Sequence, residues 1–176
     1  MHFFISFLFL LIFCFINNTL HAHGPSRQKV SENITINADP SAVWGIVSDF
    51  RKFNWNSEVK GTTAENNNIG SERLIQFKGG EKIKQKLEKI DANKMFVGWR
   101  VIETDNKILP VNSYAAKVFV KKNEDGSTTV NYKAGFYRGF MGNDPPEELN
   151  DMNSKKKVEE FIKESLKGLK KIAEKN

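Results

Sequence analysis

Histidine and cysteine, the side chains that most often serve as nucleophiles, bases and zinc ligands, are scarce in this sequence. The only cysteine is Cys14, and the three histidines are His2, His21 and His23. A Ser-His-Asp triad, a cysteine nucleophile and a zinc site with several histidine or thiolate ligands are therefore excluded. A haem attachment motif, CxxCH, is missing too, so the chain is not an electron carrier itself. We expect no metal and no cofactor.

The polar and aromatic residues that remain favour binding over catalysis. Acid–base catalysis needs an ionisable group whose pKa is tuned by burial, and no pair of carboxylates is expected to project inward. Strand parity instead predicts Arg73, Gln85 and Tyr114 as inward-facing. We therefore predict no catalytic residue and no enzyme activity. Candidates for lining an interior cavity are Trp55, Arg73, Trp99, Tyr114, Tyr132 and Phe136, although a filled core would use the same aromatic residues.

A second group of candidates lies in a segment without hydrophobic periodicity, residues 136–151. There Phe140 and Met141 stand between glycines, which makes them hard to place in a core. Exposed aromatic residues and methionine beside an arginine are typical of protein interfaces, but a lid over a cavity mouth would use them equally well. The partner-binding candidates, which include the segment ILPVNSY at 108–114, are Pro110, Asn112, Tyr137, Arg138, Phe140, Met141, Asn143 and Asp144.

Arg138 has two interpretations. By strand parity it points to the rim of the predicted sheet, where a guanidinium suits an acidic ligand or an acidic partner group. The alternative is a structural ion pair with an acidic residue of the loop that follows, namely Glu147, Glu148 or Asp151.

Hydrophobic periodicity predicts the elements that must position these residues. Alternating apolar residues predict a first strand at 29–36, and Asp39 followed by Pro40 indicates the start of a short helix. The segment 49–56 is expected to form a second short helix that ends near Trp55. A period of two then predicts six strands with short turns between them, which indicates an antiparallel meander. These strands are expected at 58–64, 71–78, 82–91, 94–103, 112–122 and 127–138.

One long amphipathic helix ends the chain. Asp144, with two prolines after it, is expected to start this helix. Its apolar stripe must be buried, and the inner face of the curved sheet is the obvious place. Residues 155–176 carry eight lysines against four glutamates, which provides either a cationic surface or a solvated face, without the aromatic stripe of a nucleic-acid-binding helix. The stripe consists of Val158, Phe161, Ile162, Leu166, Leu169, Ile172 and Ala173.

The N-terminal residues indicate export. An apolar run at 3–16 is followed by a polar stretch and Ala22, which is the pattern of a cleaved secretory signal at 1–22. The run is shorter than the ~20 residues of a membrane-spanning helix, so we predict no membrane insertion after cleavage. A periplasmic location follows, with a single domain at 23–176.

The predicted order of elements resembles the helix-grip fold of the START-like (SRPBCC) superfamily. That superfamily includes the polyketide cyclase/dehydrase proteins and the birch-pollen allergen. The resemblance implies an α+β fold, in which a curved antiparallel sheet of about seven strands wraps a long C-terminal helix and two short helices follow the first strand. It also implies a cavity between the sheet and the helix.

Three motifs resemble a narrower group, the MxaD-type proteins of bacterial methanol-oxidation clusters. They are HGPSRQKV at 23–30, ILPVNSY at 108–114 and GFYRGFMGNDPPEELND at 135–151. The resemblance implies an exported accessory protein that helps methanol dehydrogenase pass electrons to its c-type cytochrome. Such proteins often carry a Trp-His pair where this chain has Trp55 and Asn56, so no role of that imidazole is carried over.

Three functions therefore stay open at this point. The first is the accessory role in methanol oxidation, through docking on the dehydrogenase or the cytochrome. The second is a carrier or sensor of a small hydrophobic ligand, and the third is cyclase-like catalysis.

Overall fold

The computed structural model describes residues 24–175, and the predicted signal segment lies outside the described residues. Seven strands, one short helix, one 3₁₀ turn and one long helix follow each other along the chain. Their bounds are β1 (Gln28–Ile36), α2 (Pro40–Val47), β2 (Val59–Ala64), β3 (Glu72–Phe77), β4 (Lys82–Asp91), β5 (Phe96–Thr104), β6 (Val111–Lys122), β7 (Thr128–Arg138), η1 (Glu147–Leu149) and α3 (Asp151–Ala173).

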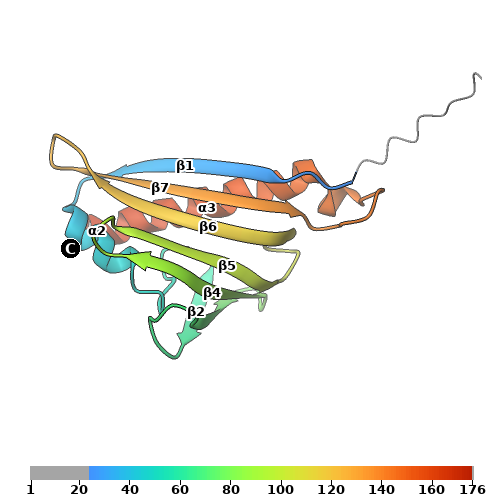
Figure 1. Ribbon diagram of the computed structural model, residues 1–176, viewed down its shortest axis with the longest axis horizontal. Helices are drawn as coiled ribbons and strands as arrows, with labels where there is room; N and C mark the ends of the chain where they lie inside the picture. Colours follow the sequence, from blue (N-terminus) through green and yellow to red (C-terminus); the bar gives the residue numbers. More distant parts are fainter. Residues whose placement is uncertain (1–23, 176) are drawn as a thin grey trace, which may run out of the picture.

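The seven strands form one antiparallel sheet in the order β1-β7-β6-β5-β4-β3-β2. Consecutive strands from β2 to β7 are neighbours, as expected of a meander, and β1 pairs with β7 from Gln28↔Phe136 to Ile36↔Thr128. Figure 1 shows that the sheet curves along one side of α3, which runs beside β1 and β7. The α+β helix-grip arrangement is therefore confirmed, and each predicted strand lies within two residues of the observed one.

Strand β6 contains a bulge that alternation alone does not predict. Its pairing with β7 shifts between Asn112 and Ala115, and Ser113 there has a φ of 49°. As a result Val111 and Tyr114, three residues apart, both point into the core. Bulges re-aim side chains in this way and are frequent beside functional sites.

Helix α3 fills the concave side of the sheet. Its stripe is buried as predicted, with Ile172 only partly covered. The predicted start at Asp144 is wrong, because the chain first forms the 3₁₀ turn η1, and α3 then begins with Asn150, whose side chain accepts a hydrogen bond from the Asn153 N–H. Capping by Asn satisfies one of the free N–H groups of the first helical turn.

The second short helix that we expected after β1 does not form. Residues 50–56 make a series of turns, and Phe50, Phe53 and Trp55 are all buried. In an α-helix, Trp55 would be rotated by about 140° from Phe50, so both could not point inward. The turns solve this problem and bring all three rings into the core.

Gly168 permits this segment to lie directly on α3. A Cβ at this position would overlap the carbonyl oxygen of Trp55, so only glycine allows the two backbones to approach so closely. The contact fixes residues 50–56 against the second half of the long helix. Asn56 adds a buried hydrogen bond, in which its Nδ2 donates to Ser165 Oγ at 3.2 Å.

We predict that Gly168→Ala lowers the free energy of unfolding by at least about 3 kcal/mol, because backbone atoms must move to relieve the clash. Gly45→Ala in α2 is the matched control, since a Cβ at that position would meet no atom within 4 Å. That control is expected to gain about 1 kcal/mol from the higher helix propensity of alanine. Urea unfolding of both variants provides the measurement, and equal effects would contradict the role of the close approach.

Candidate functional site

The six residues predicted to line a cavity all lie in the interior between the sheet and α3. None is more than 1 % exposed. Trp99 on β5 is the centre of the group, with ring centroids 6.3 Å from Trp55 and 5.6 Å from Tyr132. Tyr114 and Phe136 stack with centroids 6.1 Å apart. The structure thus brings together residues from separate parts of the chain.

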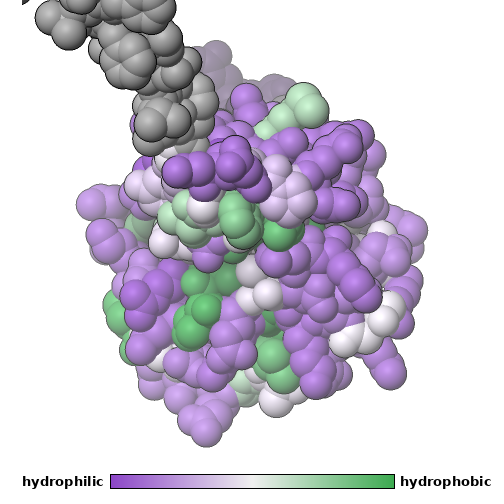
Figure 2. All heavy atoms as spheres, turned by 90° about the vertical axis from the view of Figure 1, so that its right-hand side faces the viewer, coloured by the Kyte–Doolittle hydropathy of each residue, from purple (hydrophilic) through white to green (hydrophobic). Residues whose placement is uncertain are grey.

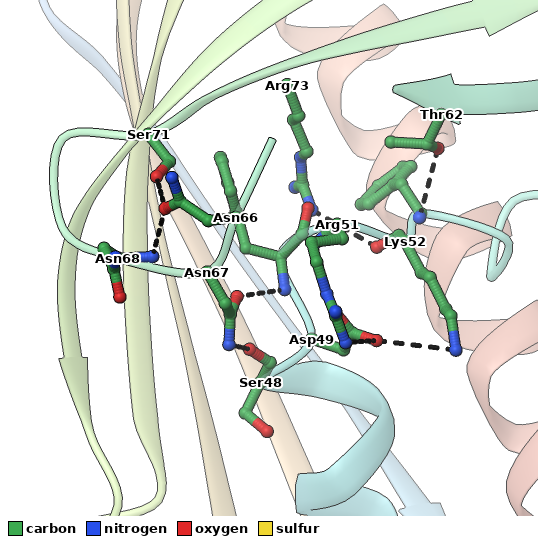
Figure 3. A network of polar contacts seen from close by, with 12 residues as sticks. Ser48, Asp49, Arg51, Lys52, Thr62, Asn66, Asn67, Asn68, Ser71 and Arg73 are labelled. Carbon is green, nitrogen blue, oxygen red and sulfur yellow. Dashed lines mark hydrogen bonds and ion pairs between the residues drawn. The ribbon is translucent and has the colours of Figure 1, made fainter. Parts of the chain in front are cut away.

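Arg73 on β3 is a buried cation inside this aromatic group. Its Nε donates to Gln85 Oε1 at 2.8 Å, and its Nη1 donates to the carbonyl oxygens of Phe50 at 3.2 Å and Lys52 at 3.4 Å. Figure 3 shows the Arg73 side chain directed at the backbone of this segment. The guanidinium carbon also lies 4.9 Å from the centre of the Trp99 ring. Cation–π contacts of this kind partly replace the lost hydration.

Burial lowers the pKa of Arg73 to about 9 from its ordinary value of 12.5. Water that would stabilise the charged form has been removed, and Tyr132 offsets only part of this effect. Within residues 24–175 no aspartate or glutamate is buried. The guanidinium is therefore charged at neutral pH without a carboxylate in the core beside it.

Four buried nitrogen atoms of this region have no hydrogen-bond partner within the described chain. An unsatisfied buried donor costs about 1–3 kcal/mol, which makes four of them a substantial fraction of the ~5–15 kcal/mol stability of a typical domain. Such a group is expected to be satisfied by a molecule other than the chain itself. The four atoms are Trp55 Nε1, Arg73 Nη2, Gln85 Nε2 and Trp99 Nε1.

Two tyrosines separate this region from the surface. The hydroxyls of Tyr114 and Tyr132 are 3.3 Å apart, and Tyr114 lines two surface hollows of about 230 and 450 Å³. Both hollows lie where β5 and β6 separate, because their pairing ends at Arg100↔Ala115 although both strands continue. The bulge in β6 that turns Tyr114 inward is at this opening.

Burial raises the pKa of Tyr132 to about 12 and that of Tyr114 well above the ordinary value of 10.0. The folded state therefore holds phenolic protons that the unfolded state releases near pH 10. Stability from these groups is complete below pH 10 and is lost as the pH rises through 12. We predict that, between pH 10 and 12, the free energy of unfolding falls less steeply with pH for Tyr132→Phe than for the wild type. Denaturant unfolding at several pH values measures this free energy. The same dependence on pH in the variant and the wild type would contradict the prediction.

The partner-binding candidates gather at the end of the sheet where β6 begins and β7 ends. Asn112 Nδ2 donates to the carbonyl oxygens of Arg138 at 3.0 Å and Gly139 at 2.8 Å. Ser154 of α3 donates to the Pro110 carbonyl at 2.7 Å. Pro110 is buried and Asn112 is half-buried, so both support the loop 139–146 from below. Tyr137 is half-buried under the Arg27 guanidinium, whereas Asn143 and Asp144 are exposed.

Of the two interpretations of Arg138, the structure shows the ion pair with an acidic residue that follows it in the chain, namely Asp151. Its Nη1 donates to Asp151 Oδ2 at 2.8 Å, and the side chain is buried. Its Nε and Nη2 donate to the carbonyl oxygens of Phe140 at 2.7 Å and Gly142 at 2.6 Å. The guanidinium therefore shapes the loop from inside, while Phe140 and Met141 remain exposed.

We predict that Arg138→Gln loosens the loop and lowers the free energy of unfolding by about 3 kcal/mol, because Asp151 and two carbonyls lose a buried charged donor. Hydrogen exchange at the amides of 140–143 should become faster. Arg51→Gln is the control, since the Arg51–Asp49 pair is exposed and its loss should leave stability nearly unchanged. A variant loop that exchanges at the wild-type rate would contradict the anchoring role.

The sequence predicts Gln85 as inward-facing but does not assign it to the site, and it does not reveal the contributions of Phe50, Asn56 and Ser165. Ser154 and Ser165 lie within the apolar stripe of α3 at helical spacing, and both are fully buried. A small polar residue inside such a stripe indicates a hydrogen bond to a packed neighbour. That signal is present in the sequence, whereas the partners of the two serines come from distant segments.

The described residues contain no group of three or more histidine, cysteine or acidic residues arranged to hold a metal ion. None of the helices within 24–175 is both long enough and apolar enough to cross a membrane.

A curved antiparallel sheet closed by one long helix defines a helix-grip protein. Residues 27–174 match the family model described as polyketide cyclase / dehydrase and lipid transport, and the chain belongs to this family. No curated protein sequence matches it.

Solved structures share the fold at low sequence identity. The protein XoxI from Bacillus cereus superposes with a TM-score of 0.69 at 17 % identity, over 82 % of this chain and 94 % of that one. An uncharacterised protein from Bacillus thuringiensis gives 0.68 at 18 %, over 82 % and 98 %. A protein from Nitrosospira multiformis gives 0.66 at 16 %, over 83 % and 96 %. Identities this low establish the fold alone.

Proposed function

We propose that the chain is an exported accessory protein of methanol oxidation that docks on methanol dehydrogenase or on its c-type cytochrome. The proposal combines the MxaD-type motifs with one structural observation, the concentration of exposed apolar side chains at one end of the molecule. The protein would act by binding and would not carry electrons or turn over a substrate.

Four of the five large apolar side chains exposed among residues 24–175 lie at the end where β5 and β7 finish and α3 begins. Figure 2, which faces this end, shows hydrophobic patches enclosed by hydrophilic atoms. An apolar centre inside a polar rim is the usual composition of a protein interface. We call this set the rim surface: Ile102 (40 % exposed), Phe140 (39 %), Met141 (49 %) and Met152 (73 %), with Ile69 (64 %) as the fifth residue, on the β2–β3 loop.

The hydrogen bonds of the loop favour an interface over a lid. Arg138 and the backbone pair Phe140 N to Leu149 O at 3.2 Å hold the loop on its own support. Gly139 lies so close to Pro110 and Leu149 that a Cβ would approach both to 3.0 Å. A loop fixed from beneath presents Phe140 and Met141 in a set conformation, which reduces the entropy lost on binding.

The motifs of the rim also meet in space. ILPVNSY and the segment around Phe140 are separated by about 25 residues of sequence, yet Ile102, Asn112 and Gly139 line one hollow. The two MxaD-type motifs thus build a single surface, as a shared docking role requires.

We predict that Phe140→Ala together with Met141→Ala weakens binding to the partner by at least about tenfold, or 1.4 kcal/mol, because a central aromatic and a methionine carry much of an interface energy. Both side chains are partly exposed, so the melting temperature should stay close to that of the wild type. Titration of purified dehydrogenase and cytochrome, each separately, measures the affinity.

Ile69→Ala is the matched control, since it removes an exposed apolar side chain from the β2–β3 loop, outside the rim surface, and should leave binding unchanged. Equal binding by the double variant and the wild type would contradict the rim surface. Failure of the wild type to bind either partner, even at low salt, would contradict the accessory role itself.

A further inference from the structure

The resemblance to helix-grip proteins implies a cavity between the sheet and α3, and we propose that in this chain the interior selects a small organic carboxylate. The ligand would be held by the four unpartnered donors of Arg73, Gln85, Trp55 and Trp99. This site goes beyond the docking role and does not depend on it, because none of its four donors belongs to the rim surface. Ile102 of the rim surface lines only the hollows between β5 and β6. It also revises the kind of ligand that we expect. The ligand would be amphiphilic, with a charged group as well as an apolar body.

The hydrogen-bonding capacity of the group determines what it accepts. All four free atoms are N–H donors: a guanidinium nitrogen, a carboxamide nitrogen and two indole nitrogens. The one acceptor of the group, Gln85 Oε1, is already occupied by Arg73 Nε at 2.8 Å. A ligand that matches must therefore offer acceptors and need not donate.

The charge of the group favours an anion over a neutral acceptor. Arg73 takes part in none of the ion pairs formed within residues 24–175, and no acidic residue of that range is buried. A buried cation is normally compensated by an opposite charge. Water would satisfy the donors but leave the charge uncompensated, whereas a carboxylate does both. Guanidinium and carboxylate also match in geometry.

The walls of the site suit an organic body attached to the carboxylate. The guanidinium carbon of Arg73 lies 4.1 Å from the centre of the Phe50 ring and 4.7 Å from that of Phe53. Trp55 and Trp99 meet edge to face with centroids 6.3 Å apart. Aromatic neighbours of this kind suit the apolar body of an organic acid better than a strongly hydrated inorganic anion, so the observations favour an apolar acid.

The opening between β5 and β6 provides a route to the site. The hollow of about 450 Å³ there is lined by Tyr114, whose hydroxyl contacts that of Tyr132, and the Tyr132 ring contacts Trp99. Movement of the tyrosine pair would connect the hollow to the donors. The backbone of β5 beyond Arg100 has no strand partner in β6 to resist such movement.

The first experiment measures binding of sodium benzoate and sodium hexanoate to the purified protein, with benzamide and hexanamide as uncharged counterparts. Melting temperature and tryptophan fluorescence are followed at constant ionic strength in sodium chloride. We expect at least one carboxylate to give a saturable rise in melting temperature and a saturable fluorescence change. Its amide should bind at least about tenfold more weakly, because it provides no charge for Arg73.

Gln85→Glu is the decisive variant. It keeps the size of the side chain and the acceptor for Arg73 Nε, and it places a carboxylate beside the guanidinium. We expect this variant to have a higher melting temperature than the wild type and to lose the response to both carboxylates. Gln85→Met, which removes a donor without adding charge, should bind more weakly than the wild type without the rise in stability.

Matched controls test whether the location is correct. Trp55→Phe removes one donor and should weaken carboxylate binding at least about fivefold, whereas Trp44→Phe on α2 changes a partly buried tryptophan outside the donor group and should not. Lys94→Gln removes an exposed positive charge from the turn between β4 and β5, away from the hollow, and should also leave binding unchanged.

Three results would overturn the proposal. The first is no saturable response of the wild type to either carboxylate. The second is a response that chloride or the amides reproduce in full. The third is a Gln85→Glu variant that binds carboxylate as tightly as the wild type does. Since the docking assay uses other residues and other partners, its outcome does not affect this one.

Discussion

The close contact between Gly168 and the backbone at Trp55 is the constraint from which the interior of this protein follows. It holds residues 50–56 against α3 in a chain of turns, and those turns direct Phe50, Phe53 and Trp55 into the core. The same turns supply the carbonyl oxygens of Phe50 and Lys52 that accept from Arg73. Without this contact the buried guanidinium would lack part of its support.

Helix α3 organises the rim as well as the interior. At its first turns, Asp151 pairs with Arg138, and Ser154 Oγ donates to the Pro110 carbonyl while it accepts from the Gly139 N–H. In its second half, Ser165 accepts from Asn56 and Gly168 contacts Trp55. One helix therefore positions two chemically different regions of the molecule.

The fold is predictable because it depends on the periodicity of apolar residues, which can be read directly from the sequence. The seven strands are predicted within two residues at every boundary, whereas the start of the long helix depends on Asn150 and not on Asp144. The missing second helix and the unpredicted bulge have a common cause, since tertiary packing favours the turns at 50–56 and the inward position of Tyr114 beside Ser113. Strand parity predicts that Arg73 and Gln85 point inward. Only the three-dimensional structure shows that Arg73 has no carboxylate partner and that four donors have no acceptor.

The buried charge also explains why the interior is unlike a simple hydrophobic core. An apolar residue in place of Arg73 would avoid the desolvation that lowers its pKa to about 9, and replacement of buried ionic groups by apolar ones is often stabilising. A domain that keeps a guanidinium, a carboxamide and two indole N–H groups beneath one sheet forgoes that stability. Sites that sacrifice stability in this way are typically those that bind or react. The polar interior, more than the fold shared with distant relatives, is thus the feature on which the proposed carboxylate site depends.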